Sequence, residues 1–390
     1  MRIINSILDN DLYKFTMGNA VFNLFPRMVV RYRFTDRNNL SYPDGFDEKL
    51  REQLCLMEGL SLSKKEKEFL QKKCGGFLPP TYIDFLEGFN YDPSEVDITL
   101  TEDNKLNISI EGYWYRTILW EVVLMAIISE LYFRETNQHV DVEDFGLYEK
   151  TFNKAESLKS HNTYFADFGT RRRYSFDNQD QVVGTLKSRG LYNFVGTSNV
   201  YLSFKHNVSP IGTHAHEWFM AHASMYGYKM ANKMALDNWV NVYQGSLGIA
   251  LTDTFTTDAF LRSFTMKYAK LFDGVRHDSG DPFEFVDKIV NHYRSVKIDP
   301  MSKVIVFSDG LDYKLANEIK EYCVGKIKSS FGIGTHFTND VGVKALNIVI
   351  KIYQILIDGV WSDCVKISDN PGKHAGSGEE VKLSKQILKL

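Results

Sequence analysis

Two histidines and a carboxylate occur together at His214-Ala215-His216-Glu217, after a short apolar run and at the start of a helical pattern. Residues 208–211 are short, apolar and proline-bearing, whereas residues 217–228 are rich in Met, Ala and aromatic side chains, which predicts a strand and then a helix. Thr213 is placed to cap that helix. A histidine in the first helical turn lies at the positive end of the helix dipole, which favours the neutral imidazole. His216 is therefore a candidate for nucleophilic or acid-base catalysis.

Two other interpretations of these histidines stay open. His214, Trp218 and His222 recur at four-residue spacing, which is typical of one buried helix face. Alternatively, two histidines two residues apart on a strand would point the same way and could bind zinc in a metal-dependent hydrolase. The further ligands would come from His277, His336, Asp253 or Asp278.

Cationic and glycine-rich turns follow other apolar runs. Phe168-Gly169-Thr170-Arg171-Arg172-Arg173 joins an aromatic ring to three guanidinium groups, which could stack on a flat ring and bind phosphate or carboxylate. A solvated basic run is the alternative. Gly196-Thr197-Ser198-Asn199 and Phe331-Gly332-Ile333-Gly334-Thr335 offer hydroxyls and backbone amides that suit an anion.

Carboxylates follow three more apolar runs. They are Asp253 in 251–254, Asp278 in 276–281 beside Arg276, and Asp309 in 308–310. Such carboxylates can orient a histidine, bind Mg²⁺ or stabilise developing positive charge, or they can be ordinary turn residues. Together with the arginines and glycines, this set suits a phosphorylated sugar or nucleotide.

Repeated strand-turn-helix patterns must position these side chains. Seven short apolar runs each end in a polar or glycine-rich turn, which predicts a βα barrel or a wound α/β sheet with ligands at the carboxyl ends of the strands. The runs are 164–170, 194–199, 209–213, 247–254, 272–280, 304–310 and 330–335. Residues 1–117 mix helical and alternating patterns and predict a smaller α+β domain, with a helix at 12–24 and strands at 28–34 and 106–110. The apolar segment 118–133, which follows this domain, predicts a buried helix.

Composition narrows the class of protein. A net charge of −3 lacks the basic excess of a nucleic-acid-binding protein, and no segment predicts a signal peptide or a membrane span. Four cysteines are widely spaced without a zinc pattern, which predicts free thiols and a cytoplasmic protein.

Taken in order, the motifs closely resemble the nicotinate phosphoribosyltransferase family over nearly the whole chain. The matching segments are DLYK at 11–14, FGTRRR at 168–173, GTSN at 196–199, AHEW at 215–218, LTDT at 251–254, RHDSGDP at 276–282, FSDG at 307–310, FGIGT at 331–335, ISD at 367–369 and PGK at 371–373. Residues 374–390 match none of them.

The resemblance implies an enzyme that forms nicotinate mononucleotide and pyrophosphate from nicotinate and 5-phosphoribosyl 1-pyrophosphate. ATP hydrolysis would be coupled through a phosphohistidine at His216, with Asp253 hydrogen-bonded to that ring. Asp278 would lie by the ribose and Mg²⁺. Phe168 and Tyr13 of a partner subunit would sandwich the pyridine ring.

The remaining implied contacts complete the site. Arg171 and Arg276 would bind the nicotinate carboxylate and the phosphate groups, and Ser198 would lie near the ring. Asp309, Gly332, Gly334 and Thr335 would surround the 5-phosphate. The family's fold implies a barrel-like, type II phosphoribosyltransferase-like domain at 118–345, packed on the α+β domain. Residues 346–390 would complete or pack on both, in a homodimer with shared active sites.

Two further functions are weighed beside this one. A related enzyme that uses nicotinamide would need no extra cation near the pyridine substituent, whereas Arg171 to Arg173 supply such cations. A non-catalytic binding module would bind 5-phosphoribosyl 1-pyrophosphate without turnover.

Overall fold

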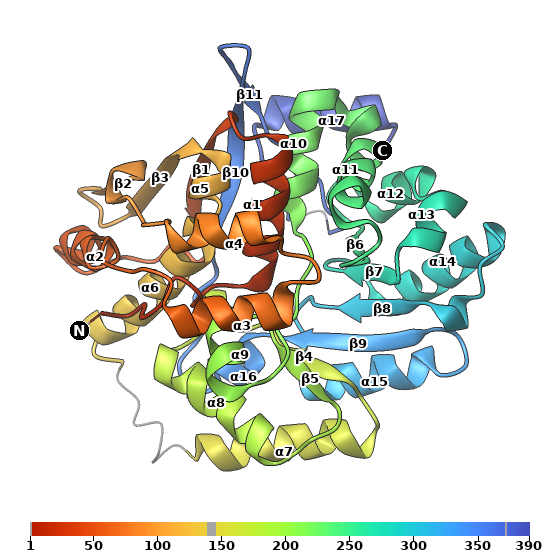
Figure 1. The fold of residues 1–390 in the computed structure, drawn as a ribbon, viewed down its shortest axis with the longest axis horizontal. Helices are drawn as coiled ribbons and strands as arrows, with labels where there is room; N and C mark the ends of the chain where they lie inside the picture. The colour runs from red at the N-terminus through yellow and green to blue at the C-terminus, as the bar shows by residue number, and fades with distance from the viewer. Residues whose placement is uncertain (1, 139–145, 371–372) are drawn as a thin grey trace.

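The computed structural model describes residues 2–138, 146–370 and 373–390 (Figure 1). Pro371 and Gly372 of the PGK motif lie outside these ranges. Two sheets organise the chain, a six-stranded parallel sheet and a five-stranded antiparallel sheet. Each sheet has its own covering helices, and the fold is therefore an α/β unit packed on a smaller α+β unit.

The parallel sheet carries the strand-turn-helix pattern. Its strand order is β5-β4-β9-β8-β7-β6, and six of the seven predicted runs each overlap one of these strands. The strands are β4 (Phe165–Asp167), β5 (Phe194–Thr197), β6 (Ile249–Leu251), β7 (Gly274–His277), β8 (Val304–Phe307) and β9 (Lys328–Ile333). The helices that connect and cover them are α7 (Leu147–Ser160), α8 (Phe176–Ser188), α9 (Val200–His206), α10 (His216–Tyr226), α11 (Tyr228–Tyr243), α12 (Thr257–Ser263), α13 (Met266–Leu271), α14 (Pro282–Ser295), α15 (Tyr313–Cys323) and the short α16 (Thr335–Thr338).

The seventh predicted run, 209–213, joins the sheet edges without forming a full strand. Pro210 makes a parallel bridge to Thr197 at the β5 edge, and the Thr213 hydroxyl donates to the Ile249 carbonyl of β6 at 3.0 Å. The segment therefore spans the gap between the two edge strands and gives the sheet its barrel-like form. Because its hydroxyl is used in this way, Thr213 does not cap α10, whose N-cap is Ala215.

The antiparallel sheet draws strands from both ends of the chain. Its order is β11-β10-β1-β3-β2, with the long strand β10 hydrogen-bonded to β1. The strands are β1 (Val29–Asp36), β2 (Val96–Leu100), β3 (Leu106–Tyr113), β10 (Ile348–Ile357) and β11 (Val360–Asp363). Residues more than 300 positions apart therefore meet on one sheet face.

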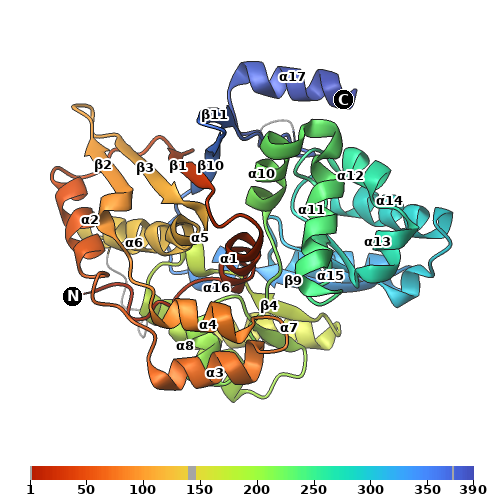
Figure 2. The same ribbon diagram turned by 45° about the horizontal axis from the view of Figure 1, so that its top comes forward.

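Helix α1 (Leu12–Leu24) lies between the two sheets (Figure 2). Its residues 12–21 are all buried, as expected for a helix that is covered on every side. The Leu12 amide donates to the Ser198 carbonyl at 2.8 Å, which ties the start of α1 to the end of β5. The N-terminal part of the molecule thus reaches directly into the carboxyl edge of the parallel sheet.

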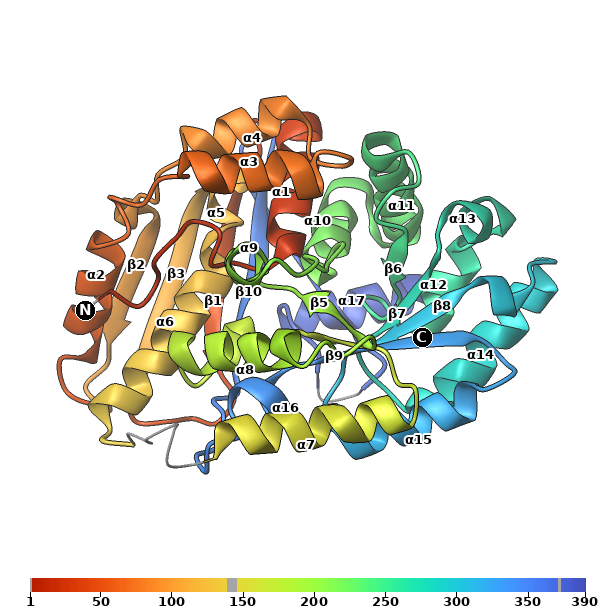
Figure 3. The same ribbon diagram turned by 60° about the horizontal axis from the view of Figure 1, so that its bottom comes forward.

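Helices α2 to α6 complete the smaller unit, and α17 packs against α11. Figure 3 shows α3 and α4 packed side by side at one end of the antiparallel sheet. The bounds are α2 (Phe46–Cys55), α3 (Lys64–Cys74), α4 (Pro80–Glu87), α5 (Trp114–Thr117), α6 (Trp120–Glu135) and α17 (Gly378–Leu388), with 3₁₀ turns at Pro93–Glu95, Thr170–Arg172 and Pro300–Ser302. All four cysteines are free thiols, as predicted. Among the described residues, no helix combines the length and apolar character needed to cross a membrane.

Candidate active site

The predicted site residues gather where the parallel strands end. Each lies at the end of a strand, in the turn that follows, or in the first turns of a helix that faces this edge. They are Tyr13 (α1), Phe168 and Arg171 (after β4), Ser198 (after β5), His216 (α10), Asp253 (after β6), Arg276 and Asp278 (β7 and beyond), Asp309 (after β8), and Gly332, Gly334 and Thr335 (β9 and beyond). Parallel strands in one sheet bring such turns together, whatever their separation in sequence.

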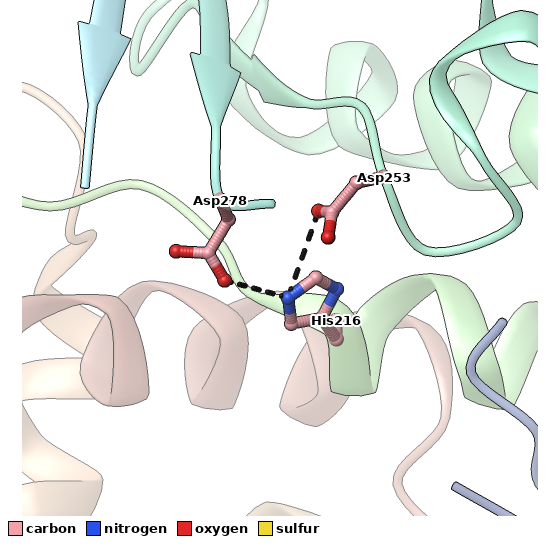
Figure 4. Close-up of side chains that lie close together, drawn as sticks. All are labelled: His216, Asp253 and Asp278. Carbon is pink, nitrogen blue, oxygen red and sulfur yellow. Dashed lines mark hydrogen bonds and ion pairs between the residues drawn. The ribbon is translucent and has the colours of Figure 1, made fainter. Parts of the chain in front are cut away.

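His216 is the first residue of α10 and faces a cluster of charged groups (Figure 4). Its Nε2 lies 2.9 Å from Asp278 Oδ2 and 2.9 Å from Lys366 Nζ. Its Nδ1 lies 3.1 Å from the Thr254 hydroxyl. The expectation that Asp253 accepts a hydrogen bond from this ring is wrong, because Asp253 Oδ1 lies 3.7 Å from Nε2 and Asp278 occupies the closer position.

Asp253 instead organises the far side of the cluster. Its Oδ2 accepts from the Ser279 hydroxyl at 2.6 Å and lies 3.2 Å from Lys366 Nζ. Its Oδ1 is buried and has no hydrogen-bond partner within the described ranges. The segment that carries Lys366 is held in place by a bond from the Ile367 amide to the Thr254 carbonyl at 2.8 Å.

Charges around the ring determine its protonation. Burial and the Lys366 ammonium lower the pKa of His216, against the opposing influence of the two carboxylates. Burial alone would raise the pKa of Asp278, but Arg276 and His216 hold it well below its usual range. The site therefore presents a neutral imidazole beside an ionised carboxylate at neutral pH.

Arg276 connects this cluster to two cavities. Its Nη2 donates to Asp278 Oδ1 at 2.8 Å and its Nε to the Ser308 hydroxyl at 2.7 Å. The same side chain lines both cavities described next, together with Phe168 and Arg171. The three residues form the shared wall between them.

The first cavity is narrow and partly aromatic. Tyr13 and Phe168 line it with Arg171 and Ser198, and all four belong to one chain. Within the described chain, α1 is tied to the end of β5 and brings Tyr13 to this cavity. The expectation that Tyr13 of a partner subunit completes the site stays a prediction. Asp11, which the sequence analysis did not single out, also lines the cavity and accepts from the Ser198 hydroxyl at 2.7 Å.

The second cavity lies over the ends of β8 and β9. Gly332, Gly334 and Thr335 line it, with Arg171, Arg172 and Arg276 on the cationic side. Gly332 packs so closely on Phe168 that an added Cβ would lie 2.2 Å from the ring. Asp309 is absent from this described lining and pairs with Lys373 Nζ at 2.6 Å.

Further cations that sequence reasoning missed come from the antiparallel sheet. Arg37 and Lys351 line a third cavity beside residues 374–377. Burial, Lys366 and Arg37 lower the pKa of Lys351 to about 7, and burial beside Arg171 and Arg37 lowers that of Arg172 to about 10. A lysine within the apolar run Ile348–Ile357 was the available signal, but the pairing of β10 with β1 could not be deduced from it.

The zinc interpretation does not fit the geometry. The His214 ring lies 4.7 Å from Trp239 and 5.2 Å from Phe219, centroid to centroid, and burial lowers its pKa to about 3. Within the part of the chain that the structure describes, the group with ligand atoms close enough for one ion is His216, Asp253 and Asp278. His214, His277 and His336 take no part in that group.

Comparison with known proteins identifies the family. The profile of the nicotinate phosphoribosyltransferase N-terminal domain matches residues 8–129, and that of the nicotinate phosphoribosyltransferase family matches residues 163–390. A curated nicotinate phosphoribosyltransferase of Chromohalobacter salexigens is 50% identical over 389 residues, covering 100% of this chain and 99% of that protein. One from Desulforapulum autotrophicum is 48% identical, covering 99% of each.

Solved structures agree with this assignment. The crystal structure of nicotinate phosphoribosyltransferase from Porphyromonas gingivalis has a TM-score of 0.97 at 47% identity, covering 100% of both chains. The corresponding structure from Vibrio cholerae has a TM-score of 0.93 at 35% identity, covering 100% of this chain and 95% of that one. With both domain profiles matched and relatives similar over their full length, the chain belongs to the nicotinate phosphoribosyltransferase family.

Proposed function

We propose that the chain transfers the phosphoribosyl group of 5-phosphoribosyl 1-pyrophosphate to nicotinate, and that ATP hydrolysis drives this reaction through a phosphohistidine at His216. The observation that carries the proposal is a neutral imidazole between Asp278 and Lys366, at the same sheet edge as cavities lined by several cations. The lowered pKa values of Lys351 (about 7) and Arg172 (about 10) mean that a bound polyanion would stabilise their charged forms. A pyrophosphate or triphosphate is such a ligand.

The first cavity suits nicotinate. Tyr13 and Phe168 offer aromatic faces for the pyridine ring. Arg171 offers a guanidinium that can donate two parallel hydrogen bonds to the nicotinate carboxylate. Nicotinamide lacks the negative charge that makes this contact strong. We therefore assign the cavity to the acid.

The second and third cavities suit the phosphates. The 5-phosphate would accept hydrogen bonds from the amides around Gly332 to Thr335, and the pyrophosphate would lie by Arg276, Arg37 and Lys351. When the bond from ribose C1 to pyrophosphate breaks, positive charge develops on the sugar. Asp278, held ionised by Arg276 and His216, would stabilise that charge, and the pyridine nitrogen would form the new bond to C1.

The phosphorylation step needs a nucleophile, and Nε2 of the neutral His216 fits that role. Its lone pair would attack the γ-phosphorus of ATP, the bond to the bridging oxygen would break, and ADP would leave with that electron pair. The ring proton at Nδ1, facing the Thr254 hydroxyl, would be lost to solvent. Water would later cleave the P–N bond and release phosphate, so that the cycle consumes one ATP and one water.

A Mg²⁺ ion fits the carboxylates of this cluster. Asp253 Oδ1 is a buried oxygen without a hydrogen-bond partner among the described residues, and it lies close to the Asp278 carboxylate. Magnesium prefers such oxygen ligands and commonly binds one or two carboxylates together with substrate phosphates. When bound, it would neutralise charge on the leaving pyrophosphate.

Steady-state rates with nicotinate and nicotinamide test the proposed substrate. We expect the value of kcat/KM for nicotinate to exceed that for nicotinamide by at least about tenfold, because only the acid pairs with Arg171. An Arg171→Gln variant should lose most of this preference. Equal values for both substrates in the unmodified protein would contradict the assignment.

A further inference from the structure

A row of alternating charges lies between His216 and the first cavity, and the proposed chemistry assigns no role to its three buried members Glu217, Lys14 and Glu121. Lys14 of α1 is fully buried, with its Nζ 2.5 Å from Glu217 Oε2 and also paired with Glu121 Oε2. The other oxygen of Glu121, Oε1, lies 3.6 Å from Arg171 Nη1. We call Glu217, Lys14, Glu121 and Arg171 the charge chain.

One end of the charge chain is fixed to the histidine. Glu217 follows His216 in the first turn of α10, and its Oε1 accepts from Trp114 Nε1 at 2.6 Å and from the Tyr32 hydroxyl. Consecutive helical residues point in different directions, so His216 faces the parallel sheet while Glu217 faces the N-terminal unit. A shift of the first turn of α10 would therefore move both side chains together.

The other end lies at the wall of the first cavity. Arg171 lines that cavity, and its side chain is 39% exposed, so it is less tightly held than Lys14. Tyr13, which precedes Lys14, lines the same cavity, and the Lys14 ammonium lies 5.4 Å from the centre of its ring. Two of the groups assigned to nicotinate are thus involved, because Tyr13 lies beside Lys14 and Arg171 belongs to the charge chain.

Glu121 has two cationic partners, Lys14 and Arg171, so a change in its contact with one affects its attraction for the other. Burial lowers the pKa of Lys14, but Glu121 and Glu217 outweigh it and hold this pKa above its usual value. A buried carboxylate that loses one cation must be compensated by another. If Lys14 moves away from Glu121 while it keeps its contact with Glu217, Glu121 therefore attracts Arg171 more strongly.

We propose that Lys14 is a positioning residue that links phosphorylation of His216 to the placement of Arg171 in the first cavity. The inference rests on the proposed phosphohistidine. A phosphate on His216 adds negative charge at the first turn of α10, which draws Lys14 toward that turn. Glu121 then holds Arg171 at the cavity wall, and nicotinate binds more tightly to the phosphorylated protein.

Calorimetric titration of the full-length protein with nicotinate, with and without Mg-ATP and in the absence of 5-phosphoribosyl 1-pyrophosphate, tests this link. For the wild-type protein we expect Mg-ATP to lower the Kd of nicotinate about tenfold, within the usual range for coupled sites. In Lys14→Met and Glu121→Gln the ratio of the two Kd values should fall to about one, because each substitution removes a charge from the charge chain. Phosphate should still be found on His216 in both variants. Lys14→Arg, which keeps the charge, should retain part of the factor.

Matched measurements separate the possible failures. Glu111→Gln removes a carboxylate from an exposed pair with Arg31, so its coupling factor should match that of the unmodified protein. If Lys14→Met does not fold, Glu121→Gln decides the question. If Glu121→Gln is phosphorylated on His216 and Mg-ATP still lowers its Kd for nicotinate as in the wild-type protein, the role of Lys14 is overturned and the proposed function stands. If the wild-type protein carries no phosphate on His216, both the role of Lys14 and the proposed function are overturned.

Discussion

The two histidines beside Ala215 differ in what surrounds them, and this difference sets their chemistry. His216 contacts Asp278, Lys366 and Thr254 at the strand ends. His214 contacts aromatic rings, and neither of its ring nitrogens has a hydrogen-bond partner in the described parts of the chain. The sequence placed both beside a predicted helix start but could not tell which ring would face the charged turns, because that depends on strands more than 30 residues away.

The buried, neutral histidines predict a pH dependence of stability. Burial lowers the pKa of His214 to about 3 and that of His222 to about 4, whereas the unfolded chain protonates histidine below about pH 6.5. Protons therefore bind preferentially to the unfolded state between pH 6.5 and 4, and the free energy of unfolding falls as the pH falls through this window. At pH 5 we expect a loss of about 2 kcal/mol per histidine relative to pH 8.

Chemical denaturation at pH 8 and pH 5 measures this loss. A His222→Phe variant should lose less stability between the two pH values, since one titrating ring is gone. Equal pH dependence in the His222→Phe variant and the unmodified protein would contradict this explanation.

At the scale of elements, close packing between β9 and the turn after β4 shapes the first cavity. Gly332 of β9 leaves room for the Phe168 ring, and an added Cβ would lie 2.2 Å from it. A Gly332→Ala substitution must therefore displace Phe168 from its position in the wall shared by the two cavities. We expect an increase of at least about tenfold in the KM for nicotinate and a loss of about 1–3 kcal/mol of stability, as for other overpacked sites.

Kinetics and denaturation of Gly332→Ala check this expectation. Gly378→Ala is the matched control, because nothing lies within 4 Å of an added Cβ at that position and both KM and stability should stay unchanged. An unaltered KM for nicotinate in Gly332→Ala would show that Phe168 does not contribute to binding.

Element-level prediction worked where the signal was local. The helix predicted at 12–24 and six of the seven apolar runs coincide with α1 and the parallel strands, because periodicity and turn residues determine such elements locally. The run at 209–213 forms only a bridge, since its Pro210 cannot donate in a ladder. Arg37 and Lys351 were missed because their proximity depends on β1 pairing with β10, which is a long-range contact without a local sequence signal.

At the scale of the whole molecule, both units of the described chain contribute to the first cavity. The antiparallel sheet combines both ends of the chain, and α1 brings Tyr13 to the same cavity as Phe168. Subunit mixing tests whether the sites are shared between chains. If each site is complete within one chain, a mixture of inactive Tyr13→Ala and His216→Ala variants remains inactive. A homodimer with shared sites would instead regain about a quarter of the activity after subunit exchange, since half of its dimers would hold one intact site of two.

Activity of the mixture after mild denaturation and refolding, compared with that of each variant alone, measures this difference. Refolded unmodified protein is the control for recovery. Recovery of about a quarter of its activity in the mixture would show that the sites are shared between chains.

The central claim is that His216 transiently carries phosphate. Its most direct test is mass spectrometry of the full-length protein quenched at alkaline pH during turnover with Mg-ATP, nicotinate and 5-phosphoribosyl 1-pyrophosphate. We predict an acid-labile phosphate on His216 that is absent from His216→Ala, together with loss of ATP stimulation in that variant. An unmodified His216 during turnover, or full ATP stimulation of His216→Ala, would contradict the claim.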